Sequence, residues 1–119
     1  MKANGGIMTA GFMAKRAVAS LGSGPTGGVM GACAVAAQTD VSDFIAIDMG
    51  GTSYEACLVT GGRPNIKSFW NWQHRYLVGV PMVEMHSIGA GGGSIAHVDR
   101  AGILKVGPRS ARARRPGAH

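Results

Sequence analysis

The sequence predicts an α/β fold in which one helix packs on a mixed sheet and glycine-rich turns join the strands. The predicted helix, residues 26–38, is rich in Gly and Ala, which allows a close approach to a sheet. Residues 44–47 are continuously apolar, as is typical of a strand covered on both faces. Consecutive glycines at 50–51, 61–62 and 91–93 mark turns next to strand-like segments.

The first part of the chain is predicted to be mainly helical. Thr9 is placed to cap a short helix that ends near Arg16. The brief apolar stretch 18–21 has the character of a strand, and the glycines at 22–24 form a turn. Pro25 suits the first position of the long helix. Glycines inside that helix cost about 1 kcal/mol each relative to Ala, so we expect close packing to require them.

Strand-like segments separated by turn residues make up most of the remaining chain. The predicted strands are residues 43–48, 54–59, 82–88, 95–98 and 103–106, with a further strand or exposed edge within 67–78. Gly61-Gly62 and the turn at 99–102 are hairpin signals. At 119 residues, the chain is expected to form one domain at most.

The segment with the most chemical content is the turn between the strands 43–48 and 54–59. Asp48 stands at the end of the first strand, where a carboxylate can hold Mg²⁺ or its waters. Gly50 and Gly51 allow a tight backbone whose N–H groups face an anion, and Thr52 and Ser53 add hydroxyl donors. This pattern predicts a phosphate-binding loop. A Gly-Gly turn between strands is also common hairpin chemistry that needs no ligand.

Charge and cysteine content exclude several classes of function. The net charge of +6 is uneven, since residues 1–108 hold eight basic and six acidic residues while the last eleven hold four arginines and no acid. The aromatic residues lie far from that basic tail, so nucleic-acid binding is not expected. Two isolated cysteines suit free thiols in a reducing compartment. The longest apolar stretch, 29–37, falls short of the roughly 20 residues of a membrane span, and a cytoplasmic location is expected.

Two further patterns suggest other sites. Gly22-x-Gly24-x-x-Gly27 matches a dinucleotide-binding fingerprint, with Asp48 at the distance of a ribose-binding acid. The chain then turns directly into another strand where such a fold enters a crossover helix, which argues against that interpretation. The histidines are spaced unlike a compact metal site and are expected to be structural or surface residues.

The chain resembles the hydantoinase A/oxoprolinase family, the ATP-using subunits of N-methylhydantoinases, 5-oxoprolinases and acetone or acetophenone carboxylases. The resemblance rests on motifs in a fixed order that cover nearly all of residues 4–108. These motifs are Asn4-Gly-Gly-Ile-Met8, Ser23-Gly-Pro-Thr-Gly-Gly-Val-Met-Gly-Ala32, Asp48-Met-Gly-Gly-Thr-Ser53, Ile88-Gly-Ala-Gly-Gly-Gly-Ser-Ile-Ala96 and Val106-Gly-Pro108.

The resemblance implies that residues 1–108 form part of the second lobe of an actin-like ATPase (ribonuclease H-like) fold. It implies ATP and Mg²⁺ as cofactors, bound by Asp48, Gly50, Gly51, Thr52 and Ser53, with Asp48 serving the metal. The second loop, Gly91, Gly92, Gly93 and Ser94, would lie near the nucleotide. The implied function is ATP-dependent hydrolysis of a cyclic amide, or carboxylation of a ketone, with a hydantoinase B-type partner. No residue is assigned a catalytic role.

Two departures from the family pattern lead to the alternatives. Glu55 stands where the family usually has Asp. After Pro108 the family continues with an acidic, glycine-rich stretch, whereas residues 109–119 are an Arg-rich tail that is disordered or read out of frame. No first-lobe phosphate loop precedes Met1, so an inactive fragment of a truncated or frameshifted gene is expected. The alternatives are a non-catalytic phosphate- or subunit-binding module and a dinucleotide-binding oxidoreductase fragment.

Overall fold

The computed structural model describes residues 1–72 and 76–111, which form two compact units. The first unit comprises residues 1–46 and 57–85, and the second comprises 47–56 and the described residues from 86 onward. Strands β1 (Phe44–Met49) and β2 (Tyr54–Thr60) contribute residues to both units. No helix in the described ranges is long and apolar enough to cross a membrane.

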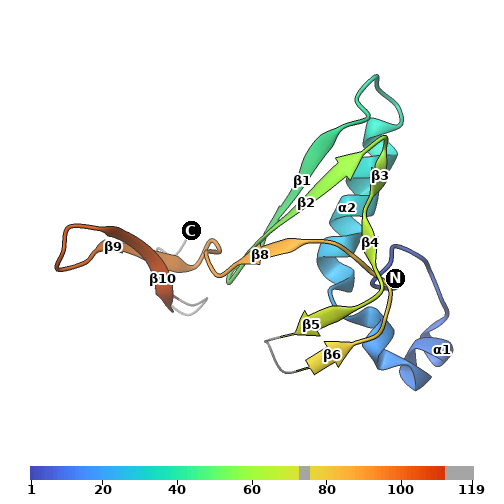
Figure 1. The fold of residues 1–119 in the computed structure, drawn as a ribbon, viewed down its shortest axis with the longest axis horizontal. Helices are drawn as coiled ribbons and strands as arrows, with labels where there is room; N and C mark the ends of the chain where they lie inside the picture. The colour runs from blue at the N-terminus through green and yellow to red at the C-terminus, as the bar shows by residue number, and fades with distance from the viewer. Residues whose placement is uncertain (73–75, 112–119) are drawn as a thin grey trace. The chain divides into compact units, whose positions relative to one another are not determined.

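Three helices open the first unit (Figure 1). Helix α1 (Ala10–Lys15) begins after Thr9, whose side chain accepts a hydrogen bond from the Phe12 amide, as predicted. The predicted strand at 18–21 is wrong: the chain forms a 3₁₀ helix, η1 (Ala17–Ser20), because four residues are too few to carry a strand period.

Helix α2 (Ser23–Ala36) begins three residues earlier than predicted. Gly22 precedes it in the left-handed conformation, with φ of 64°, so Pro25 lies within the first turn. There the missing N–H of proline costs no helical hydrogen bond. Gly24 and Gly31 have no described atom within 4 Å of where a Cβ would stand. The predicted packing requirement is therefore not found at those two glycines.

The core of the first unit lies between α2 and the first strands, which run side by side in Figure 1. Its buried members are Val29, Ala46, Cys57, Val59 and Val83. Burying a side chain the size of valine stabilises a fold by roughly 1.5 kcal/mol or more. Thr26 is also fully buried, and its hydroxyl donates to the Gly22 carbonyl at 2.8 Å and shares that hydrogen with the Ala3 carbonyl at 3.3 Å, so the hydroxyl is satisfied.

Short strands complete the first unit. Gly61 and Gly62, with φ of 57° and 72°, make the predicted hairpin turn from β2 to β3 (Arg63–Pro64). The segment predicted as a strand or edge contains β4 (Ile66–Lys67), β5 (Trp70–Trp72) and β6 (Tyr76–Val78). Strand β4 pairs with β7 (Met82–Val83), and β5 pairs with β6.

The second unit contains β8 (His86–Ile88), which pairs with the Tyr54–Ala56 part of β2, and a closing hairpin. That hairpin joins β9 (Ser94–Val98) to β10 (Leu104–Ser110) through the predicted turn at 99–102. Arg109 and Ser110 thus belong to a strand, and residues 112–119 of the predicted tail lie outside the described residues.

The α/β class is confirmed, but the predicted mixed sheet is not found. The pairings with a defined register, β2–β3, β2–β8, β4–β7, β5–β6 and β9–β10, are antiparallel. Two of them, β2–β3 and β9–β10, join consecutive strands through short described turns, which only antiparallel strands permit. The predicted cover on both faces of 44–47 is also absent from this chain, since Ile45 is 64% exposed on the side away from α2.

Candidate functional site

The turn after β1 lies wholly within the second unit. Asp48 occupies the penultimate position of β1 and is half-buried. The Gly50 amide donates to the Ser53 carbonyl at 3.0 Å and closes the turn before β2 begins at Tyr54. The predicted strand–turn–strand arrangement is therefore present, although the Gly50 amide is used inside the turn and is not available to an anion.

The second glycine-rich loop lies directly against this turn. The Gly92 amide donates to the Gly50 carbonyl at 2.9 Å, and the Gly93 amide donates to the Gly51 carbonyl at 2.8 Å. Two loops separated by some forty residues of sequence are thus joined by consecutive backbone hydrogen bonds. The structure brings together the two segments that the sequence analysis selected separately.

Two glycines of the second loop are required by this contact. Gly91 is buried, and a Cβ there would stand 2.5 Å from the Thr52 and Ser53 backbone nitrogens. A Cβ on Gly93 would stand 2.8 Å from the Gly51 carbonyl oxygen. Backbone atoms cannot rotate away as a flexible side chain can, so either side chain would separate the loops. By contrast, a Cβ on Gly92 would make only an ordinary 3.7 Å contact.

The second loop is also closed on itself and tied to the final hairpin. The Ser94 hydroxyl accepts from the Gly91 amide at 3.0 Å, and the Ser94 amide donates to the Gly91 carbonyl at 2.9 Å. From the end of β10, the Ser110 hydroxyl and the Ala111 amide both donate to the Gly93 carbonyl. Ser94, predicted as a ligand-binding hydroxyl, is therefore engaged in shaping its own loop.

Glu55 holds two hydroxyl groups beside the turn. Its Oε1 accepts a 2.5 Å hydrogen bond from Ser53 Oγ and a 3.1 Å bond from Ser87 Oγ, the latter from the cross-strand neighbour on β8. The hydrogen of the Ser53 hydroxyl is thus directed at Glu55. Ser53 was predicted to donate to phosphate, but in this arrangement its oxygen offers lone pairs only.

The groups of the turn that keep their hydrogen-bonding capacity are the Asp48 carboxylate, the Thr52 hydroxyl and the amides of Gly51, Thr52 and Ser53. Among the described residues, none of these has a hydrogen-bonding or ionic partner. Gly91 packs against the Thr52–Ser53 peptide and closes one side of it. The turn therefore offers consecutive N–H donors next to a carboxylate, which suits an anion accompanied by a cation.

The other candidate sites of the sequence analysis find less support. The dinucleotide fingerprint at Gly22–Gly27 lacks its preceding strand, because η1 stands there. The described ranges contain no group of three His, Cys, Asp or Glu side chains that could hold a metal, and His74 lies outside them. Cys33 and Cys57 are free thiols, as predicted.

Sequence reasoning missed the parts played by Glu55 and Ser87. Glu55 was noted only as a departure from a pattern, and nothing in the sequence pairs it with a serine 32 positions away. The loop-to-loop contact was missed as well, because hydrogen bonds between backbone atoms leave no side-chain signature.

Comparison with known proteins gives consistent matches. A family model described as hydantoinase/oxoprolinase matches residues 1–118. The caprolactamase subunit alpha of Pseudomonas jessenii is 44% identical over 110 residues, which is 92% of this chain and 16% of that protein. The acetophenone carboxylase gamma subunit of Aromatoleum aromaticum is 42% identical over 89 residues, 74% of this chain and 12% of that protein.

A solved structure is also similar to this chain. The nucleotide-free structure of acetone carboxylase, described under ATP-dependent acetone carboxylation, superposes with a TM-score of 0.73 at 34% identity. The match covers 93% of this chain and 15% of that one. The chain thus spans about a sixth of the length of the relatives it matches.

Proposed function

This chain belongs to the hydantoinase/oxoprolinase family, and from that premise we propose that its two joined glycine-rich loops form part of an ATP phosphate site. The enzyme would be an ATP-dependent one that acts on a cyclic amide or a ketone, as the names of the relatives suggest. Because the chain spans so small a part of those relatives, the activity belongs to a larger assembly of which these loops are one wall.

The observation that carries the proposal is the set of groups at the turn that have no partner among the residues the structure describes. Gly51, Thr52 and Ser53 present consecutive amides, and the second loop fixes the shape of the turn through the bonds to Gly50 and Gly51. Such a preformed row of N–H donors needs no reorganisation when a phosphate binds.

The residues at the turn also fit Mg²⁺. Asp48 has a half-buried carboxylate without a partner among the described residues, whereas the Glu55 carboxylate already accepts two hydroxyl groups. Mg²⁺ is commonly held by one or two carboxylates together with water and phosphate oxygens. Asp48 would hold the ion directly or through its waters, and the ion would neutralise phosphate charge when bound.

The roles of the chain's own groups follow from their hydrogen bonds. The amides of 51–53 would hold and orient the phosphate oxygens. Glu55 would keep the Ser53 hydroxyl hydrogen directed at its own carboxylate, so that Ser53 Oγ would offer only lone pairs to a ligand. The bound nucleotide would supply the activating phosphoryl group, and this chain would supply binding and orientation.

The wider setting is proposed on the family premise alone. The loops would belong to the second lobe of an actin-like ATPase fold in a cytoplasmic enzyme. The matched relatives are named as subunits, which supports a partner subunit for this chain, of hydantoinase B type.

A titration with Mg·ATP tests the phosphate site. We expect the chain to bind, with Asp48→Asn weakening binding at least about tenfold through loss of one charge-assisted contact. Asp40→Asn, at an exposed carboxylate that is not part of the turn, is the matched control and should change nothing. Gly24→Ala should also bind normally. NAD(H) binding that depends on Gly24, or Mg·ATP binding that ignores Asp48, would contradict the proposal.

A further inference from the structure

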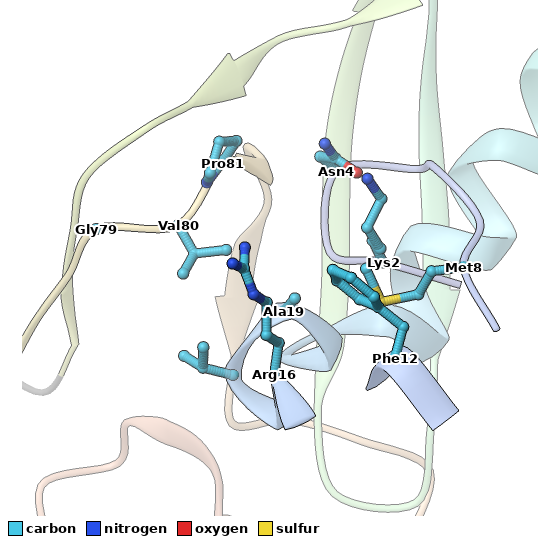
Figure 2. A pocket seen from close by; sticks show the side chains of 10 residues that line it. Lys2, Asn4, Met8, Phe12, Arg16, Ala19, Gly79, Val80 and Pro81 are labelled. Atoms are coloured by element: carbon cyan, nitrogen blue, oxygen red, sulfur yellow. The ribbon is translucent and has the colours of Figure 1, made fainter. Parts of the chain in front are cut away.

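A cavity lies in the first unit, and every residue that lines it belongs to that unit. It has a volume of about 680 Å³ and lies among the N-terminal turn, α1 and the segment 79–81 (Figure 2). Its lining combines apolar side chains with hydrogen-bond donors. The proposed phosphate site uses none of these residues, so the two inferences stand independently.

The polar part of the lining is cationic. Lys2 and Arg16 both line the cavity, and no carboxylate is among the lining residues. Among the described residues neither cation is in an ion pair, and Arg16 lies over the Phe12 ring with its guanidinium 5.3 Å from the ring centre. A guanidinium that lies over an aromatic ring can still donate hydrogen bonds through its N–H groups.

Asn4 lies next to Lys2 and helps to place it. Asn4 Oδ1 accepts from the Gly6 amide at 3.1 Å, and Figure 2 shows the same oxygen facing the Lys2 ammonium. The Lys2 ammonium and Asn4 Oδ1 both lie within 3.3 Å of the position that a Cβ on Gly6 would take. Lys2 and Asn4 are therefore neighbours, and only the absence of a side chain at Gly6 lets them meet.

The backbone that carries these donors is fixed by hydrogen bonds within the unit. The Lys2 amide donates to the Gly6 carbonyl at 2.7 Å, and the Ala3 amide donates to the Ala19 carbonyl at 2.7 Å. The Ala3 carbonyl in turn accepts from the Val83 amide at 2.8 Å. The backbone that carries Lys2 is therefore held within the unit.

The remaining walls are apolar, formed by Met8, Phe12, Val80 and Pro81. Figure 2 shows the Arg16 guanidinium beside Val80 and the end of the Lys2 side chain beside Asn4, so cations from two segments line the same apolar space. A ligand that matches this lining has a small anionic head and an apolar body. A bare phosphate would leave the apolar walls unused.

We propose that this cavity binds an organic carboxylate whose apolar body contacts Met8, Phe12 and Val80 while its carboxylate meets Lys2 and Arg16. The planar guanidinium fork matches the two oxygens of a carboxylate, and the Lys2 ammonium adds a second positive charge. Loss of either cation would remove a charge-assisted hydrogen bond and weaken binding about tenfold.

The test is an amide-resolved NMR titration of the full 119-residue chain with cyclohexylacetate. We expect shifts at Ala19 and Gly79, which line the cavity, and about tenfold weaker binding for Arg16→Gln and for Lys2→Gln. Lys105→Gln, at an exposed cation in β10, is the matched control and should bind normally. Arg16→Lys keeps the charge without the fork and should fall between the chain and Arg16→Gln.

Each other outcome counts against the site. Equal binding of the neutral 2-cyclohexylethanol would show an apolar hollow without an anion site. Equal binding of acetate would show surface charge without a cavity. Absence of shifts at Ala19 and Gly79, or an amide spectrum without dispersion, would overturn the proposal outright. If the Arg16→Gln variant is unfolded, as judged by an amide spectrum without dispersion, the affinities of Arg16→Lys and the unchanged chain are compared instead. Equal affinities of these two would then contradict the site.

Discussion

Each of the two units is stabilised from within by a different kind of contact. In the first unit, Val29, Val59 and Val83 are buried against one another, and side-chain volume fills the space between α2 and the strands. In the second unit, the two loops meet where Gly91 and Gly93 have no side chain at all, and backbone hydrogen bonds make the contact.

The difference teaches where each unit tolerates change. A core of packed side chains loses stability when volume is removed, because a cavity remains. A contact between two backbones loses stability when volume is added, because the neighbouring atoms cannot move aside. The first arrangement mainly supports a fold. The second fixes the positions of N–H and C=O groups, which is the property that a phosphate site needs.

Gly91→Ala is expected to have the largest effect. The new Cβ would stand 2.5 Å from backbone atoms of Thr52 and Ser53, so the loops must separate. We expect a loss of about 3 kcal/mol in the free energy of unfolding, measured by urea denaturation, together with loss of Mg·ATP binding. The matched control is Gly92→Ala in the same loop, where a Cβ meets only the Gly50 oxygen at 3.7 Å. Equal effects of the two changes would refute the account of the contact.

Val59→Ala tests the other side of the comparison. Val59 is fully buried in the core of the first unit, and truncation leaves a cavity worth about 2 kcal/mol of unfolding free energy. Leu58→Ala, one residue along β2 and 65% exposed, should stay within about 0.5 kcal/mol of the unchanged chain. A larger loss at Leu58 than at Val59 would mean that the outer face of the strand is the covered one.

Glu55→Gln asks whether side chains also matter in the second unit. The neutral amide weakens the bonds from Ser53 and Ser87, with an expected cost of about 1 kcal/mol. Ser87→Ala removes the 3.1 Å bond alone, and the two changes together should cost less than their sum because they share that bond. Full additivity in urea unfolding would show that the bond contributes nothing.

Turn and cap chemistry could be predicted from the sequence because those signals are local. Thr9 capped its helix, and Gly61-Gly62 made its hairpin, since each depends on a few neighbouring residues. The strand predicted over 82–88 was divided into β7 and β8, because the chain changes pairing partner from β4 to β2 near Glu84. A change of partner is a tertiary event that residue type does not encode.

For the candidate site, the sequence indicated both loops but not their contact. Asp48 and Gly50 to Ser53 stand at the predicted turn, and Gly91 to Ser94 at the second loop, yet the bonds between them are made by amides and carbonyls common to all residues. The sequence predicts that the Ser53 hydroxyl donates to phosphate, because nothing in the sequence indicates that it donates to Glu55. In the structure it does donate to Glu55. The prediction of an ATP ligand came from the family resemblance alone.

Cys57 offers the smallest effect and a test that leaves the loops untouched. Burial in the core of the first unit raises the pKa of the Cys57 thiol, and the nearby Cys33 and Glu84 groups raise it further. As pH rises, the Cys57 thiol ionises in the unfolded chain before it ionises in the folded chain. The stability that comes from burying the neutral thiol is therefore fully present below the unfolded pKa of 9.0 and is lost as pH rises through the higher folded value. Unfolding free energy measured under reducing conditions should therefore be flat from about pH 7 to pH 8 and fall above about pH 9. Cys57→Ala should flatten that alkaline fall at a lower overall stability, whereas Cys33→Ala should keep most of it. If the loss of stability at high pH is the same in Cys57→Ala, then groups other than the Cys57 thiol cause it, and the prediction is wrong.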